Sequence, residues 1–121
     1  MSELNKFMTW TFTEEVPVPD SIKDILIAGE TATTAYKTIR DVAVVTNKRL
    51  IIADRQGLTG KKIEIYTIPF KSIVMYSSEN GGTFDINSEL ELWTRAGRFK
   101  LNLNKKVDVR KLDKIIAEAL L

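Results

Sequence analysis

The side chains that most often carry out chemistry in proteins are missing from this sequence. The chain of 121 residues contains no histidine and no cysteine. Histidine is the usual general base and the commonest metal ligand, while cysteine supplies thiolates for catalysis, metal binding and disulfides. Nucleophile systems of the Ser–His and Cys–His kinds are therefore impossible, and so are zinc sites built from these ligands. The sequence predicts a protein that is not an enzyme and that has no cofactor and no metal site.

Two carboxylates and one glycine string resemble parts of known sites. Glu89 and Glu91 are two residues apart on a predicted strand, so they share a face on which paired carboxylates could bind a divalent cation. Residues 57–61 read Gly-Leu-Thr-Gly-Lys, but a phosphate-binding P-loop has a longer gap between its glycines and a Ser or Thr after its lysine. We interpret the carboxylates as part of a solvated outer face and the glycine string as a hairpin turn.

Basic residues in and beside the turns form a candidate ligand-binding patch. They are Lys48, Arg49, Arg55, Lys61 and Lys62. Together they could hold the phosphates of an anionic lipid or a phosphoinositide-type headgroup, which would make the chain a peripheral membrane-binding module. Hairpin turns also carry lysine and arginine simply for solubility, so membrane contact is the less favoured of two functional hypotheses. A nucleic-acid partner is not expected, because the bases are interleaved with acids and no basic strand carries a pair of aromatic residues.

The elements that must position these residues are mostly strands. Short apolar runs recur roughly every 8–12 residues with turn signals between them, a pattern typical of a sandwich or barrel. A helix is predicted over residues 107–120, where apolar side chains recur at three- and four-residue spacing behind Asp108 as N-cap. The strands are expected at residues 34–40, 42–46, 50–54, 62–68, 72–78, 85–94 and 98–103.

The register of two hairpins can be tested against the hydrophobic pattern. With a turn centred on residues 96–97, Leu92 faces Leu101 and the opposite side of both strands is polar. With a turn centred on residues 47–48, both faces of the hairpin are apolar, although one face of an antiparallel sheet is normally wet. The second face must therefore be covered by the N-terminal segment, the C-terminal helix or another subunit.

The N-terminal residues carry a strand and a short helix of their own. Residues 8–13 alternate strictly between large apolar side chains and threonine, which predicts a strand outside the set of seven. A short helix is predicted over residues 20–28, with Asp20 as its cap and Gly29 at its end. No run approaches the roughly 18 apolar residues of a membrane span, and the start lacks the basic and apolar regions of a signal peptide. A cytoplasmic location is the resulting expectation.

Five segments of the chain resemble a known family in the right order. They are residues 35–41 (AYKTIRD), 46–51 (TNKRLI), 56–62 (QGLTGKK), 68–73 (IPFKSI) and 82–85 (GTFD). Together they resemble the bacterial pleckstrin-homology (PH) domain family over about residues 20–121. The resemblance implies a mainly β, PH-like fold, in which two nearly orthogonal antiparallel sheets with seven strands in all are closed at one end by the C-terminal helix. It also implies a non-enzymatic module that assembles into ring-like homo-oligomers and has no defined ligand.

Two apolar surfaces have no partner in this scheme. We divide the chain into an N-terminal arm, residues 1–19, and a PH-like domain, residues 20–121. Either the arm folds back over its own sheet, or both surfaces are buried against neighbouring copies of the chain. The favoured prediction is a homo-oligomer that acts as an interaction scaffold. Its expected interface consists of Met8, Trp10, Phe12, Val42, Val44 and Ile51.

Overall fold

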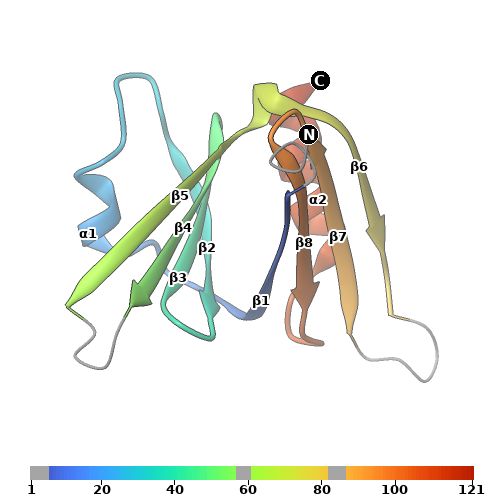
Figure 1. The fold of residues 1–121 in the computed structure, drawn as a ribbon, viewed down its shortest axis with the longest axis horizontal. Coiled ribbons are helices and arrows are strands. Elements are labelled where there is room, and N and C mark those ends of the chain that lie inside the picture. Colours follow the sequence, from blue (N-terminus) through green and yellow to red (C-terminus); the bar gives the residue numbers. More distant parts are fainter. Residues whose placement is uncertain (1–5, 57–60, 82–86) are drawn as a thin grey trace.

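The chain folds into one continuous sheet with a helix at its C-terminal end. The computed structural model describes residues 6–56, 61–81 and 87–121. Within them, eight strands are ordered β5-β4-β3-β2-β1-β8-β7-β6, and Figure 1 shows β2–β5 on one side and β6–β8 on the other. The predicted mainly β fold with a C-terminal helix is confirmed. The elements are β1 (Lys6–Val16), α1 (Asp20–Lys23), β2 (Ala32–Thr38), β3 (Val42–Thr46), β4 (Arg49–Gln56), β5 (Lys62–Pro69), η2 (Phe70–Ser72), β6 (Ile73–Glu79), β7 (Ser88–Thr94), β8 (Gly97–Leu103) and α2 (Val109–Leu120).

The first strand, β1, joins the two sides of the sheet. Residues 6–12 pair in parallel with β8, and residues 12–16 pair antiparallel with β2. The register shifts between Phe12 and Glu14, and an irregularity of this kind lets one strand turn from one sheet into the next. The seven predicted strands correspond to β2–β8 and the predicted N-terminal strand corresponds to β1. Only the separation of that strand from the others is wrong, because β1 lies in the middle of an eight-stranded sheet and pairs in parallel with β8. The alternation of residues 8–13 predicts a strand, but it does not identify the strands that pair with it.

The apolar face of β1 points into the main core of the molecule. Phe12 is fully buried, and its ring stacks on that of Tyr36 with 5.1 Å between the ring centroids. Trp10 stacks on Phe99 of β8 at 5.8 Å and meets the ring of Tyr66 of β5 edge-on at 5.4 Å. The side chains of β1 therefore touch both sides of the fold, and they hold together strands that lie far apart in the sheet order.

The segment between β1 and β2 covers the second apolar face of the β2–β4 hairpins. Val44 and Ile51 are fully buried on this face, and Ile22 of α1 is buried against them. Of the three covers considered from the sequence, the structure uses the N-terminal segment. The further apolar side chains packed against this cluster are Val16, Val18, Ile25, Leu26, Ala32 and Val42.

The short helix α1 differs from its prediction in length and in cap. It ends at Lys23, and Pro19 occupies the N-cap position. Asp20 lies in the first turn instead, where its carboxylate accepts a hydrogen bond from Nζ of Lys23 at 3.0 Å. The first turn of a helix is unfavourable in free energy and is offset only when further turns add hydrogen bonds. This short segment therefore adopts only as much helix as its packing on the sheet stabilises. Gly29 has a φ of 79°, in agreement with a glycine that ends this segment.

The two hairpins test the predicted registers. In the β3–β4 hairpin, Val44 pairs with Ile51 as predicted. In the β7–β8 hairpin, Leu92 pairs with Phe99 rather than Leu101, so that register was wrong by two residues. The turn lies one residue earlier than predicted, because the hydroxyl of Thr94 accepts hydrogen bonds from the two backbone N–H groups of residues 96 and 97. Two residues are one full strand period, so the inner and outer faces are those predicted.

The C-terminal helix, α2, begins directly after Asp108, two residues later than the predicted start at residue 107. The carboxylate of Asp108 accepts hydrogen bonds from the backbone N–H groups of residues 110 and 111, both at 3.1 Å, which confirms Asp108 as the N-cap. Val109, Leu112 and Ile116 form its buried stripe. In the described part of the chain, no helix is long and apolar enough to cross a membrane. The predicted glycine-string turn at residues 57–60 and the start of the strand predicted at residue 85 lie outside the described residues.

Candidate functional site

The five basic residues of the predicted patch do not lie together. Lys48 and Arg49 lie at the turn between β3 and β4, whereas Arg55, Lys61 and Lys62 lie at the opposite end of β4 and β5. A strand advances about 3.3 Å per residue, so β4 separates the two groups by roughly 20 Å. The prediction of a single basic patch is therefore wrong. The residues are close in sequence, but an extended strand carries them to opposite ends of the molecule.

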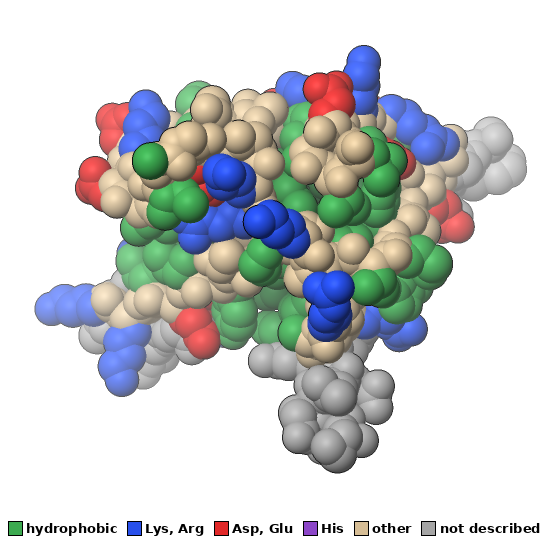
Figure 2. All heavy atoms as spheres, turned by 90° about the horizontal axis from the view of Figure 1, so that it is seen from above, with side chains coloured by type: hydrophobic (Ala, Val, Ile, Leu, Met, Phe, Trp, Pro, Cys, Tyr) green, Lys and Arg blue, Asp and Glu red, His purple; other side chains and the backbone are tan. Residues whose placement is uncertain are grey.

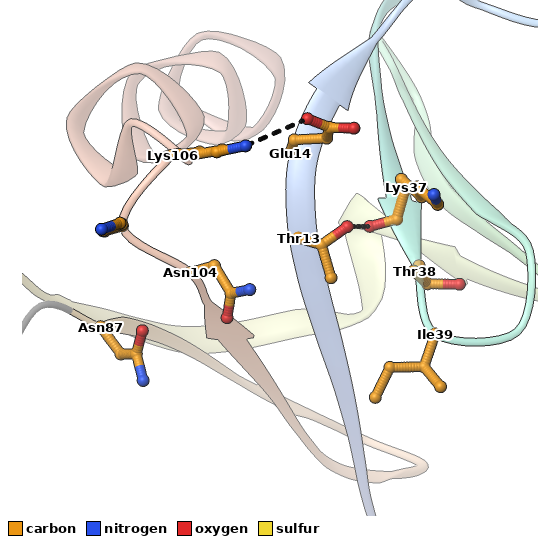
Figure 3. Close-up of a pocket in the computed structure, with 9 residues that line it drawn as sticks. Thr13, Glu14, Lys37, Thr38, Ile39, Asn87, Asn104 and Lys106 are labelled. Atoms are coloured by element: carbon orange, nitrogen blue, oxygen red, sulfur yellow. Dashed lines mark hydrogen bonds and ion pairs between the residues drawn. The ribbon is translucent and has the colours of Figure 1, made fainter.

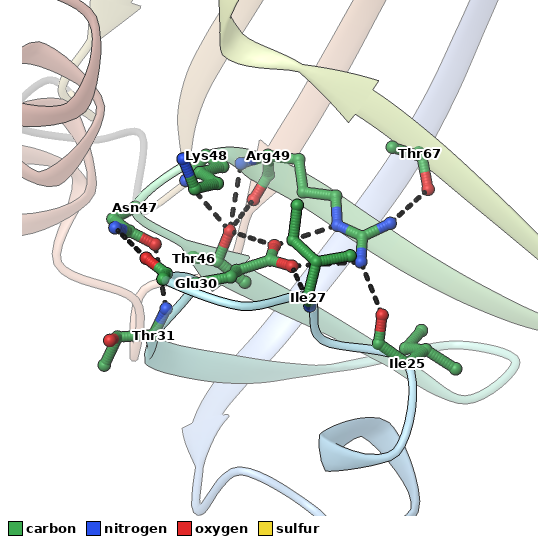
Figure 4. Close-up of polar contacts among 10 residues, drawn as sticks. Ile25, Ile27, Glu30, Thr31, Thr46, Asn47, Lys48, Arg49 and Thr67 are labelled. Carbon is green, nitrogen blue, oxygen red and sulfur yellow. Dashed lines mark hydrogen bonds and ion pairs between the residues drawn. The ribbon is translucent and has the colours of Figure 1, made fainter.

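Arg49 is occupied by contacts within the protein (Figure 4). Its Nε lies 2.8 Å from Oε2 of Glu30, and its Nη2 donates to Oε1 of the same carboxylate at 3.1 Å. Nη2 also donates to the carbonyl oxygen of Ile25 at 2.8 Å, and Nη1 donates to the hydroxyl of Thr67 at 3.2 Å. A guanidinium held by this many acceptors has little capacity left for a ligand. Arg49 therefore fastens the N-terminal segment to β4 and β5.

The partner of Arg49 is a buried carboxylate. The side chain of Glu30 is 0% exposed, and it also accepts hydrogen bonds from the hydroxyl of Thr46 at 2.7 Å and the backbone N–H of Ile27 at 3.1 Å. The hydrogen bond from Arg49 lowers the pKa of Glu30 to about 2, although burial acts in the opposite direction. Nothing in the sequence marks this residue, because its partner is 19 positions away in an element with a different pattern.

A groove with a cavity of about 600 Å³ opens beside this network. It lies between the β3–β4 turn, the residues around η2 and the last turn of α2. Figure 2 views this end of the molecule from above and shows hydrophobic side chains in hollows, with Lys and Arg side chains around them. The apolar lining consists of Ile27, Pro69, Phe70, Ala119 and Leu120. The charged lining consists of Glu30, Lys48, Arg49 and Lys71.

A second cavity, of about 500 Å³, lies where β1 bends (Figure 3). The hydroxyl of Thr13 donates to the carbonyl oxygen of Lys37 at 3.1 Å, and Nζ of Lys106 lies 3.9 Å from the carboxylate of Glu14. These contacts tie the bend to the end of β2 and to the residues after β8. We interpret the polar groups here as part of the joint between the two sides of the sheet.

The six residues predicted to form a subunit interface are mostly used inside the chain. Phe12, Val44 and Ile51 are completely inaccessible, so the structure contradicts their assignment to an interface. Met8 and Trp10 are half-buried and pack against the main core, and Val42 packs against the second apolar cluster. The reason is the same for the residues of β1 and for those of β3 and β4. In both cases β1 and the segment between β1 and β2 bury apolar faces whose partners the sequence pattern does not identify.

Exposed apolar side chains are found instead on the two end strands of the sheet. β5 and β6 each pair with one neighbour only, because they stand at the two ends of the strand order. Ile63 and Ile65 on β5 are 47% and 44% exposed, and Val74 and Met75 on β6 are 66% and 54% exposed. Sequence reasoning missed these residues, because an apolar run predicts a strand without showing whether that strand lies at an edge.

Glu89 and Glu91 lie on the outer face of β7, as expected. Nζ of Lys100 lies 3.3 Å from the carboxylate of Glu89, and Nε of Arg98 lies 2.9 Å from that of Glu91. Each carboxylate therefore has a cation across the strand pair, and these pairs are stabilising cross-strand contacts at the surface.

The strand order, the bent first strand and the helix against one side of the sheet define a PH-like module. The chain belongs to the bacterial PH domain family, whose sequence model matches residues 3–120. The matched range begins well before residue 20, where the resemblance of individual segments began, and it includes all of β1.

Two solved structures and two sequence relatives are similar to this chain. A protein with a pleckstrin-homology domain from Shewanella loihica PV-4 is 38% identical, with a TM-score of 0.77 over 89% of this chain and 97% of that one. A pleckstrin homology domain from Shewanella amazonensis SB2B is 41% identical, with a TM-score of 0.66 over 84% of this chain and 83% of that one.

Two uncharacterised proteins of Bacillus subtilis (strain 168) also match. YjqA is 49% identical over 76 residues, which are 63% of this chain and 61% of YjqA, so the match spans less than two thirds of that relative. YozO is 29% identical over 99 residues, which are 82% of this chain and 86% of YozO.

Proposed function

We propose that the protein is a non-enzymatic PH-like module that assembles with copies of itself into a closed homo-oligomer and acts as an interaction scaffold. The observation that carries the proposal is the pair of open sheet edges, β5 and β6, each with two exposed large apolar side chains. This surface replaces the interface predicted from the sequence.

An open edge with apolar side chains favours contact with another chain. The outer backbone N–H and C=O groups of an end strand have no strand partner in the sheet, and soluble proteins usually protect such edges with charges, prolines or bulges. β5 carries charged side chains at Lys62 and Glu64 and a proline at its last position, and β6 has a register shift between Ile73 and Met75, so both edges are only partly protected. Pairing β5 of one copy with β6 of the next would satisfy the backbone groups and bury Ile63, Ile65, Val74 and Met75 together.

The position of the two edges favours a ring over a dimer. A contact between β5 of one copy and β6 of another is head-to-tail, because it joins two different surfaces. An open assembly of any length then keeps one free β5 edge and one free β6 edge until it closes on itself. Head-to-tail contacts with a suitable rotation generate cyclic oligomers.

The test is the mass of the protein in solution, measured by light scattering over a range of concentrations. We expect the wild-type protein to have a mass several times that of one chain, 13.7 kDa. The double variant Ile63→Lys/Ile65→Lys and the single variant Val74→Lys should both shift toward one chain, because each places charge on an apolar edge.

Ile39→Lys is the matched control for these variants. Ile39 is 79% exposed but lies in the turn after β2, away from both edges, so its variant should keep the wild-type mass. A wild-type protein that has the mass of one chain at every concentration would refute the proposal.

The anionic-lipid alternative has less structural support. Its five basic residues are divided between two ends of the molecule, and Arg49 is held by Glu30. Self-assembly is therefore the function we propose.

A further inference from the structure

We propose that the groove beside the β3–β4 turn binds a small amphipathic anion, which is a molecule with an apolar chain and a carboxylate or phosphate head. This inference goes beyond the proposed self-assembly and rests on a different part of the surface. It follows from the shape of the groove, its apolar wall and the balance of charge along its lining.

The apolar wall is built from two distant parts of the chain. Phe70, which follows β5, is almost completely buried, while Ala119 and Leu120 come from the last turn of α2 and are half-buried. Ile27 is 61% exposed, which is a high exposure for a large aliphatic side chain beside a hollow. A cavity of about 600 Å³ is in the usual size range of small-molecule sites, which are lined mainly by apolar side chains with a few polar groups.

The charge along the lining is unbalanced in favour of cations. Among the described residues that line the groove, Glu30 is the one with a side-chain carboxylate, and Arg49 neutralises it. Lys48 and Lys71 are both exposed, and neither side chain has a hydrogen-bond or ion-pair partner among the residues that the structure describes. The groove therefore presents two cations that have no anion of their own.

The hydrogen-bond network of Arg49 and Glu30 holds one wall of the groove in place. Arg49 is held by Glu30, by the carbonyl oxygen of Ile25 and by the hydroxyl of Thr67, so it does not need to be reordered when a ligand binds. The head of the ligand is then expected at Lys48 and Lys71, which contact the anion, while its chain lies along Phe70, Ala119 and Leu120. A preorganised wall lowers the cost of binding.

The test is calorimetric titration of the full chain with single-chain amphiphiles below their micelle concentrations. Decanoate and decyl phosphate carry the two possible heads, inorganic phosphate has no chain, and decyltrimethylammonium has the same chain with a positive head. We expect both anionic amphiphiles to bind, with affinity that rises roughly three- to fourfold for each added methylene between octanoate and decanoate. Inorganic phosphate and the cationic amphiphile should bind at least tenfold more weakly.

Two variants separate the head from the chain. Lys48→Glu/Lys71→Glu should weaken decanoate binding at least tenfold, whereas the control Lys105→Glu/Lys114→Glu carries the same change in net charge outside the groove and should bind as wild type. Ile27→Ser should reduce the gain in affinity per methylene and leave the preference for an anionic head intact. Circular dichroism of each variant establishes that it is folded.

Several results would overturn the proposal. They are equal binding of the cationic amphiphile, unchanged binding by the Lys48→Glu/Lys71→Glu variant, or no binding of any monomeric amphiphile. Binding to anionic vesicles without binding of monomeric decanoate would assign the two lysines to a membrane surface instead. The variant Ile63→Lys/Ile65→Lys keeps the two proposals apart, because it should lose assembly and still bind decanoate.

Discussion

The carboxylate of Glu30 shows how one residue can hold a segment that has little regular structure. Residues 24–31 are mostly outside helix and strand, yet they lie over the apolar face of β3 and β4. Glu30 and Arg49 fasten them there, and Asn47 adds two more contacts, with the backbone N–H of Thr31 at 2.8 Å and the carbonyl oxygen of Gly29 at 3.1 Å. A buried pair of this kind contributes less than its Coulomb energy suggests, but breaking it is costly.

Glu30→Gln is expected to lower the free energy of unfolding by about 2–4 kcal/mol, as measured by urea denaturation. The variant keeps the shape of the side chain but leaves the guanidinium of Arg49 in a mostly buried site without its counter-ion. Asp20→Asn is the control, because it removes an exposed ion pair with Lys23 and should cost less than about 1 kcal/mol. Equal losses in the two variants would contradict this role for Glu30.

The same residue predicts how stability responds to acid. The pKa of Glu30 is about 2 in the folded protein and has its ordinary value of 4.5 when the chain is unfolded. Because the folded pKa is the lower one, the unfolded chain takes up the proton first, and the contribution of Glu30 is complete above pH 4.5 and is lost as the pH falls toward 2. Unfolding curves at several pH values should show the difference between wild type and Glu30→Gln shrinking over this window. A difference that stays constant from pH 7 to pH 3 would count against it.

At the scale of elements, β1 determines whether the two sides of the sheet form one body. It is paired on both edges, in parallel with β8 and antiparallel with β2, and its aromatic side chains reach Tyr36 and Tyr66 on one side and Phe99 on the other. Without β1, both β2 and β8 would become open edges around an exposed core.

Phe12→Ala is expected to cost about 3–5 kcal/mol of unfolding free energy, because it leaves a cavity at the bend of β1 where the ring of Tyr36 now stacks. Thr9→Ala on the exposed face of the same strand should change stability by less than about 0.5 kcal/mol.

Deleting residues 1–16 should abolish cooperative unfolding altogether. A truncated chain that retains a sharp thermal transition would show that β1 is dispensable to the fold.

At the scale of the whole molecule, the two ends of the strand order carry four of the large apolar side chains that remain exposed, which are Ile63, Ile65, Val74 and Met75. The basic residues are spread over both ends of the barrel-like body, and several of them pair with acids, such as Arg40 with Asp54 and Arg55 with Asp41. Because the proposal uses the exposed apolar side chains and the open backbone groups of β5 and β6, the proposed contacts between copies are apolar and backbone contacts rather than ionic ones.

Assembly through these edges should resist salt. Ionic contacts at a surface are largely screened at high ionic strength, whereas apolar burial and strand pairing are not weakened in the same way. Light scattering in 0.1 M and in about 1 M sodium chloride should therefore give the same mass. Dissociation at the higher salt concentration would indicate that ionic contacts hold the interface together. It would contradict an interface formed by Ile63, Ile65, Val74 and Met75.

The sequence by itself determined the features that depend on near neighbours. The alternation along β7 and β8, the pairing of Val44 with Ile51 and the cap formed by Asp108 all involve residues within one hairpin or one helical turn. The sequence patterns that predict these features therefore lie within short stretches of the chain. The predicted register that failed, that of β7 and β8, did so by a whole strand period, which leaves every side chain on its predicted face.

The tertiary structure alone decided which distant segments meet. It placed β1 between β2 and β8, put Glu30 against Arg49, covered Val44 and Ile51 with residues from α1, and left β5 and β6 as the edges. Each of these outcomes depends on contacts between parts of the chain that are far apart in sequence, and a local pattern of apolar and polar residues cannot specify its partner. The same apolar residues that could have formed a surface between copies are buried within one chain, because β1 and the segment after it were long enough to reach them.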